Sequence, residues 1–256
     1  MKIKVIKIGG KLIENREVLA RLCDGLSSLG EPFVLVHGGG VMGSQLATKL
    51  GVEVKMHEGR RITDEATLEI AVMAYAGLAN KRVVAALQAR GVNACGLSGC
   101  DMAVVKSHRR PVKDIDWGLV GDVDSVDADV LAMLLGAGAI PVVSPITFSP
   151  EGELLNTNAD SVASAVAMGL ASKYEVELVF TLDKAGVLLD VDDPTSLIPT
   201  ITPTLYAELR EQEKIHSGMI PKIYNAYKTI EAGVDKVRLT SPDNLTGGTV
   251  VVKSRV

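Results

Sequence analysis

The chain has 256 residues, 47% hydrophobic and 23% charged, so it can bury a substantial core and does not have the composition of a disordered protein. Aromatic residues supply only 4%, which leaves small and branched aliphatic side chains to build the core and argues against an all-β sandwich. With 27 basic and 31 acidic residues the net charge is -4, which gives no general electrostatic footprint for nucleic acid or for an anionic membrane.

Cysteine usage and the N-terminus predict a cytoplasmic protein. There are three cysteines, an odd number with no CxxC pair, and this predicts a reducing compartment. The first residues are charged at every second or third position and contain no apolar signal core. The longest apolar run, 130–143, is broken by glycine and proline and is shorter than the ~20 residues of a membrane span. We therefore expect a soluble protein with no membrane partner.

Short apolar strands, glycine turns and helices alternate through the first third of the chain. A strand at 3–8 ends at Gly9–Gly10 and precedes a helix at about 15–29. A second strand at 32–36 leads into Gly38–Gly39–Gly40 and another helix, near residues 45–50. A long helix is predicted over 63–90, where one apolar stripe keeps three- and four-residue spacing. The stripe comprises Leu68, Ala71, Val72, Tyr75, Leu78, Ala79 and Val83.

The same alternation continues to the C-terminus. Predicted strands lie at 93–97, 140–143, 178–182, 236–239 and 249–253, and predicted helices at 128–136, 160–170, 205–211 and 220–232. Residues 104–126 suit hairpins outside the main sheet. The pattern predicts an α/β fold, a three-layer αβα sandwich around a largely parallel open sheet. We expect one continuous domain with two lobes, 1–170 and 171–256.

The two glycine turns are candidate anion-binding sites. In parallel α/β sheets, ligands bind beyond the carboxyl ends of the strands, where such turns and helix N-termini meet. Gly9, Gly10, Gly39 and Gly40 would let the backbone approach a phosphate or carboxylate closely. Neither turn is a Rossmann GxGxxG or a P-loop, and glycine pairs after strands are often only tight turns.

Charged and amide side chains near these turns favour anion binding over simple tight turns. Lys7 stands just before a glycine turn, where an apolar strand residue would be expected, although a lysine reaching out to water is the simple alternative. Residues 156–160, NTNAD, put two amides and a carboxylate at a helix start, where capping needs only one. Lys222 lies in the first turn of a helix, where the dipole disfavours a cation, and this suggests an anionic ligand nearby.

Together these segments resemble the amino-acid kinase family and, within it, the N-acetylglutamate kinases. The likeness spans nearly the whole chain and rests on about ten short motifs in matching order. The motifs include Lys7–Gly10, His37–Gly40, Gly59–Thr63, Gly77–Lys81, Gly96–Gly99, Asn156–Asp160, Asp183–Val187 and Gly218–Lys222.

The resemblance implies ATP-dependent phosphorylation of the side-chain carboxylate of N-acetyl-L-glutamate in arginine biosynthesis. By likeness, Lys7 and Lys222 would stabilise the transferring phosphoryl group, and Asp160 would orient both. Arg61, Asn156, Gly39 and Gly40 would hold the acylated amino acid. Gly9, Gly10, Thr181, Asp183 and Gly186 would contact the nucleotide. Magnesium is expected to be bound through the nucleotide phosphates, since the sequence offers no carboxylate cluster with metal-ligand spacing.

Three alternatives remain open at this point. The substrate could be N-succinylglutamate or a carrier-bound aminoadipate, and the non-enzymatic alternative is a nucleotide-sensing binding protein.

Relatives that arginine inhibits carry a helix ahead of the first strand, and here only Met1 and Lys2 precede it. From this likeness we expect a homodimer, formed through the helix at 63–90, that arginine does not inhibit.

Overall fold

The computed structural model describes residues 1–212, 214–215 and 219–253. An eight-stranded sheet has the order β12-β14-β13-β11-β1-β2-β8-β5, and every neighbouring pair is parallel except β13 with β14. Its strands are β1 (Lys2–Ile8), β2 (Phe33–His37), β5 (Ala94–Leu97), β8 (Ile140–Val143), β11 (Glu175–Thr181), β12 (Thr200–Ile201), β13 (Lys236–Thr240) and β14 (Thr249–Val252). The predicted α/β class and largely parallel sheet are confirmed.

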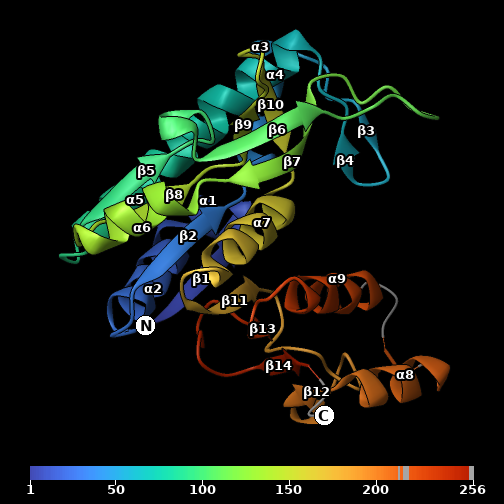
Figure 1. Cartoon of the computed structure of the whole chain (residues 1–256). Coiled ribbons are helices and arrows are strands. Elements are labelled where there is room, and N and C mark those ends of the chain that lie inside the picture. Colours follow the sequence, from blue (N-terminus) through green and yellow to red (C-terminus); the bar gives the residue numbers. More distant parts are fainter. Residues whose placement is uncertain (213, 216–218, 254–256) are drawn as a thin grey trace.

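Helices cover both faces of this sheet, and alternation along β1 shows how the faces are divided (Figure 1). Ile3 and Val5 belong to a core shared with α7 and α9, whereas Ile6 and Ile8 belong to a second core shared with α2 and α5. Lys7 follows the parity of Ile3 and Val5, so it points to the side of α7. The helices are α1 (Gly10–Glu14), α2 (Arg16–Ser27), α3 (Gly40–Leu50), α4 (Glu65–Ala71), α5 (Asn80–Gln88), α6 (Ala128–Gly136), α7 (Ala159–Ala171), α8 (Pro203–Glu211) and α9 (Ile220–Glu231).

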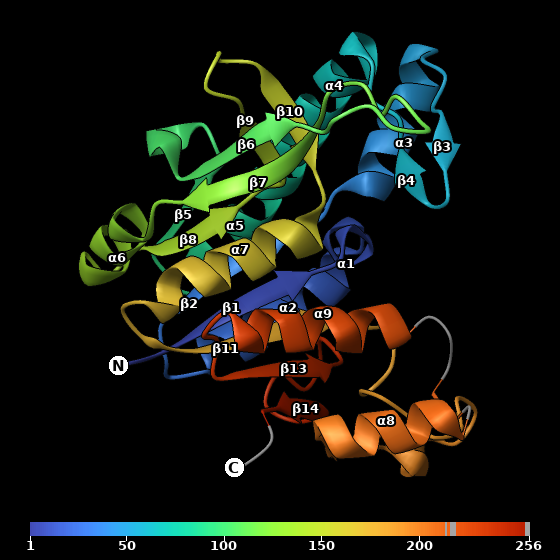
Figure 2. The same cartoon turned by 45° about the vertical axis from the view of Figure 1, so that its right-hand side comes forward.

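A small closed barrel stands beside the sheet, above α7 in Figure 2. It contains β6 (Val105–Arg109), β7 (Val120–Val126), β9 (Ile146–Phe148) and β10 (Leu154–Thr157). The prediction of hairpins outside the main sheet at 104–126 is therefore confirmed, whereas β9 and β10 were not predicted. Residues 156 and 157 were assigned to a helix start, but they end β10 because Asn156 and Thr157 pair in parallel with β7. A further hairpin, β3 (Met56–His57) with β4 (Arg60–Arg61), projects near α3 and α4.

The long helix predicted over 63–90 is present but its winding changes halfway. An eight-residue π-helix, Val72–Ala79, joins α4 to α5. The predicted stripe holds at Ala71, Tyr75, Ala79 and Val83, which are buried, but fails at Leu78, which is 49% exposed. The π-helix has more residues per turn than an α-helix, so the buried face advances by an extra residue at this point.

This helical stretch is also the one in the described part of the chain that is long and apolar enough to cross a membrane. It runs over Glu65–Gln88, 24 residues, and 44% of its most apolar window is buried inside the fold. A core helix of a globular domain has the same length and composition, so the observation is weak evidence for a span. Of the motif Gly218–Lys222, the first residue lies outside the described residues.

Candidate active site

The two glycine turns meet at the carboxyl ends of β1 and β2. Gly38 N donates a hydrogen bond to the carbonyl of Ile8 at 2.9 Å, which ties the second turn to the end of β1. A Cβ atom on Gly10 would lie 3.0 Å from the backbone nitrogen of Gly39, so a side chain at this position would push the two backbones apart. Gly9 and Gly40 have open space where their side chains would be. The turns therefore form one continuous backbone surface with free amides at the N-termini of α1 and α3.

Lys7 and Asp160 form an ion pair beside these turns. Lys7 Nζ lies 2.7 Å from Asp160 Oδ1, and the lysine side chain is only 18% exposed. Asp160 comes from the first turn of α7, on the side of the sheet to which β1 directs Lys7. The Oδ1 atom of Asp160 is itself buried, so this contact is shielded from water. An oriented ammonium group thus stands at the edge of the glycine surface.

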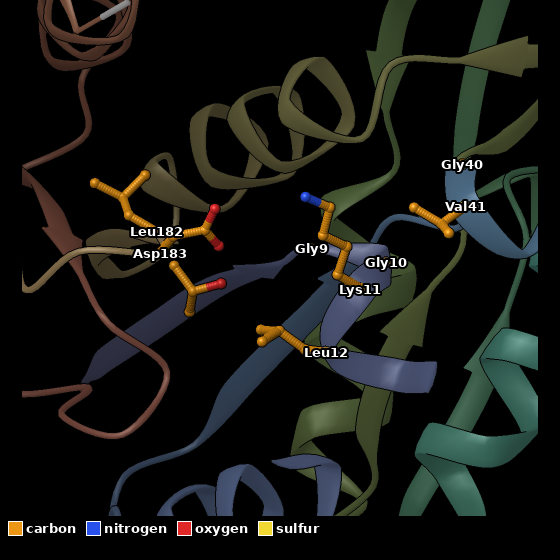
Figure 3. A pocket seen from close by; sticks show the side chains of 9 residues that line it. Gly9, Gly10, Lys11, Leu12, Gly40, Val41, Leu182 and Asp183 are labelled. Atoms are coloured by element: carbon orange, nitrogen blue, oxygen red, sulfur yellow. The ribbon is translucent and has the colours of Figure 1, made fainter. Parts of the chain in front are cut away.

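A pocket of about 270 Å³ lies between the first glycine turn and the end of β11. Figure 3 shows Leu182 and Asp183 on one side of it and Gly9 to Leu12 on the other, with Gly40 and Val41 beyond. Thr181, also in the lining, donates from Oγ1 to the carbonyl of Lys7 at 3.1 Å. This contact ties β11 to β1 at the level of the ion pair. The pocket is open, and it is built from both predicted lobes.

Arg61 closes the side of the site formed by α3. It lies at the end of β4, and its Nη2 donates to the carbonyl of Gly40 at 3.0 Å and to Ser44 Oγ at 2.8 Å. The guanidinium is therefore anchored to the first turn of α3 by one nitrogen. The guanidinium also lies beside the Tyr75 hydroxyl, and its other donors can bind a planar anion such as a carboxylate.

The three polar side chains of the segment 156–160 make different contacts. Asn158 is the N-cap of α7, accepting from Asp160 N at 2.8 Å and Ser161 N at 3.2 Å. Asn156 points elsewhere and donates from Nδ2 to Thr63 Oγ1 at 3.0 Å. Capping thus uses one of the three polar side chains, as the sequence indicated, while Asp160 pairs with Lys7 and Asn156 bonds to Thr63.

Two predicted residues stand apart from this cluster. Lys222 is exposed on the first turn of α9, and within the described residues it makes no ion pair with Asp160. Gly186 is buried, and a Cβ there would lie 2.7 Å from Leu197 Cδ1 and from Thr249 Oγ1. Gly186 is therefore a tightly packed glycine within the loop that follows β11.

Lys11 is a lining residue that the sequence analysis missed. It follows Gly10 on the short helix α1, is exposed, and lies across the pocket from Asp183 (Figure 3). The signal was a second lysine four residues after Lys7, on the far side of the glycine turn. The apolar lining residues Leu12, Val41 and Leu182 carried no such signal, because aliphatic residues beside a turn are indistinguishable from core.

Comparison with known proteins places this geometry in a family. The model of the amino acid kinase family matches residues 2–241. The chain belongs to the amino acid kinase family. A protein of Phocaeicola vulgatus called acetylglutamate kinase is 48% identical over 254 residues, 98% of this chain and 99% of its own. The predicted membership of this family is confirmed.

Solved structures of similar proteins agree with the fold. The structure of smu.665 from Streptococcus mutans superposes with a TM-score of 0.78 at 32% identity, and the match covers 98% of both chains. The structure of N-acetylglutamate synthase from Neisseria gonorrhoeae, complexed with coenzyme A and N-acetyl-glutamate, gives a TM-score of 0.82 at 26% identity over 99% of this chain and 60% of that one. This amino acid kinase therefore has the architecture of its family over almost its full length.

Proposed function

We propose that the protein phosphorylates the side-chain carboxylate of N-acetyl-L-glutamate with ATP, in the cytoplasm, as a step of arginine biosynthesis. The observation that carries the proposal is the Lys7–Asp160 ion pair beside two contacting glycine turns, in a chain 48% identical to a protein called acetylglutamate kinase. In the reaction a carboxylate oxygen bonds to the γ-phosphorus. The bond from that phosphorus to the bridging oxygen breaks, and ADP leaves with the electron pair.

The side chains of the site suit this chemistry. The attacking carboxylate is ionised at neutral pH and needs no general base, so the protein has to position the two reactants and stabilise charge. Lys7 would balance charge on the transferring phosphoryl group, Asp160 would hold its direction, and Lys222 would approach from α9 when the nucleotide is bound. The amides of Gly10, Gly39 and Gly40 would donate to phosphate and substrate oxygens.

The pocket beside the first glycine turn would take the nucleotide. Gly9, Thr181 and Asp183 line it, and Gly186 would shape the loop that follows β11. In the described residues no group of three or more His, Cys, Asp or Glu side chains is placed to hold a metal ion. We propose that Mg²⁺ enters with ATP on the phosphate oxygens and supplies positive charge there.

The acylated amino acid would lie on the α3 and β10 side. Arg61 would bind its α-carboxylate, and Asn156 its acylamino group, with Gly39 and Gly40 beneath. N-succinylglutamate and carrier-bound aminoadipate are the alternative substrates for this site.

Turnover measurements with N-acetyl-, N-succinyl- and unacylated glutamate, coupled to ADP release, test the proposal. We expect the highest kcat/KM with N-acetylglutamate. A higher kcat/KM with N-succinylglutamate would make that compound the substrate in place of N-acetylglutamate. Nucleotide binding without turnover of any of the three compounds would favour a nucleotide-sensing protein.

Arg61→Ala is expected to raise KM for the acylated amino acid by roughly 10- to 100-fold, the effect of losing a charged hydrogen-bonding partner, while KM for ATP stays nearly unchanged. Arg60→Ala is the matched control, since Arg60 precedes it on β4 and is exposed. Steady-state kinetics with each substrate varied in turn give both constants. A large change in the ATP constant instead would move Arg61 to the phosphate side of the site.

We propose that residues 1–170 mainly bind the acylated substrate and that residues 171–256 mainly bind the nucleotide.

We also propose that the chain functions as a homodimer. Met73 and Leu78, on the long helix, are 48% and 49% exposed, which leaves an apolar face for a second copy. Light scattering is expected to give twice the 27.0 kDa chain mass, and Leu78→Glu to shift it toward the monomer. A monomeric mass for the unmodified protein would contradict the proposal.

A further inference from the structure

Three polar or aromatic side chains are buried directly behind the second glycine turn and have no part in the chemistry proposed above. His37 is 0% exposed, Asn80 1% and Tyr75 4%. Buried polar groups carry a cost unless they are hydrogen-bonded, so their arrangement behind a functional turn requires a reason.

Tyr75 presses on the turn from the helix side. A Cβ on Gly39 would lie 2.2 Å from Tyr75 Cδ1, and a Cβ on Gly43 would lie 2.9 Å from Tyr75 Cε1. The ring therefore fills the space that side chains at these two positions would need. It limits how far Gly39 can move toward the helix that carries Tyr75.

Asn80 fixes the ring of His37, and the partners of its amide decide which way the amide faces. Its Oδ1 accepts from Lys81 Nζ, which can only donate, at 3.1 Å. Its Nδ2 faces the carbonyl of Val142, which can only accept, at 2.9 Å. The second hydrogen on Nδ2 then points to His37 Nε2, 3.1 Å away.

This pattern determines the tautomer of His37. Nε2 accepts from Asn80, so the proton of the neutral ring is on Nδ1, and Nδ1 donates to the carbonyl of Gly38 at 2.9 Å. Burial lowers the pKa of His37 to about 4, so the ring is neutral in the physiological range. Fixing the Gly38 carbonyl fixes the plane of the peptide group that carries the Gly39 N–H.

The π-helix explains how one helix supplies both Tyr75 and Asn80. Five residues of α-helix would separate the two side chains by about 140° around the axis. In the π-helix Val72–Ala79 the N–H of Asn80 donates to the carbonyl of Tyr75, an i to i+5 bond that brings the two residues onto nearly the same face. Both then point at β2 and the turn that follows it.

We propose that the π-helical segment is the positioning element of the glycine turn, with Tyr75 packed against Gly39 and Asn80 acting through His37 on the carbonyl of Gly38. The inference rests on the proposed function, because it assigns the turn's amides to phosphate and substrate oxygens. Tyr75, Asn80 and His37 are thus positioning residues that hold the turn at the distance and orientation the reaction needs.

Three substitutions at His37 separate positioning from packing. Asn keeps a donor near the place of Nδ1, Gln keeps a polar atom only near the place of Nε2, and Phe keeps a ring without either. We expect His37→Asn to retain most of the wild-type kcat, and His37→Gln and His37→Phe to lose about tenfold, with both KM values little changed. His108→Asn, on β6 of the barrel, is the matched control and should equal the wild type.

The melting temperature of each variant is measured alongside kcat. A packing role predicts that activity follows stability, so that Phe is no worse than Asn, and this result would overturn the proposal. Equal kcat for all three variants would overturn it as well. If the wild type fails to phosphorylate any acylated glutamate, the proposed function is wrong, and this is seen before any variant is compared.

Discussion

Replacing Lys7 or Lys222 with alanine is expected to lower kcat by roughly 10²- to 10³-fold while KM for either substrate changes little. In the transition state, negative charge spreads over the phosphoryl oxygens. A positive group stabilises this charge most strongly when the group is already oriented and partly shielded from water. Lys7 has both properties, with its ammonium 2.7 Å from Asp160 and its side chain 18% exposed. The Lys222→Ala variant tests whether α9 approaches the site when the nucleotide is bound, as the proposed mechanism requires.

Lys2→Ala is the control for these two variants. Lys2 begins the same strand, is 68% exposed, and pairs with Glu175 at 3.4 Å far from the glycine turns. Its removal should leave kcat unchanged. If either the Lys7 or the Lys222 variant turns over near the wild-type rate, that lysine is not part of the charge stabilisation.

Glu177→Gln is expected to destabilise the fold by about 3–5 kcal/mol, the cost of removing one partner from a buried ionic group. Glu177 is buried on β11, and its carboxylate lies 2.6 Å from Arg238 Nε, 3.5 Å from Lys4 Nζ and 3.7 Å from Lys236 Nζ. Lys4, Glu177 and Lys236 are register partners across β1, β11 and β13, so the three charges form a ladder across the middle of the sheet. Without the carboxylate, Arg238 loses its acidic partner, and Lys4, which is buried, keeps only its contact with the half-exposed Glu31 among the described residues.

Urea unfolding followed by circular dichroism measures this effect. Glu175→Gln is a matched control two residues earlier on the same strand, where the side chain is 51% exposed and pairs with the exposed Lys2, and its effect should stay within about 1 kcal/mol. Similar midpoints for the two variants would show that the ladder contributes no more than a surface pair.

The parts of the fold that could be predicted from sequence are those in which local pattern and tertiary environment agree. The strands next to the glycine turns are largely apolar because helices cover both faces of the sheet, and this reads directly in residues 3–8 and 33–37. Lys7 stood out because it interrupts such a strand, and the structure pairs it with Asp160.

The parts that could not be predicted depend on contacts across the fold. Periodicity at 3.6 residues cannot reveal a π-helix, since the change in winding shows only where Tyr75 and Asn80 meet the turn from β2. Strand β9 has three residues and is defined by its barrel partners rather than by its own pattern. Lys11 looked like an ordinary exposed lysine until the pocket it lines was in view.

The pairing of β1 with β11 limits how the enzyme can move. All six registered pairs, from Lys2 with Glu175 to Lys7 with Phe180, join a strand of the first half of the chain to one of the second in a single parallel ladder. A hinge between halves would have to break this ladder in the middle of the sheet. Opening and closing during turnover is therefore left to elements at the rim, such as the β3–β4 hairpin and the start of α9. The distance between the two bound reactants is set by a rigid floor, and a mutation that loosens that floor should impair alignment before it impairs binding.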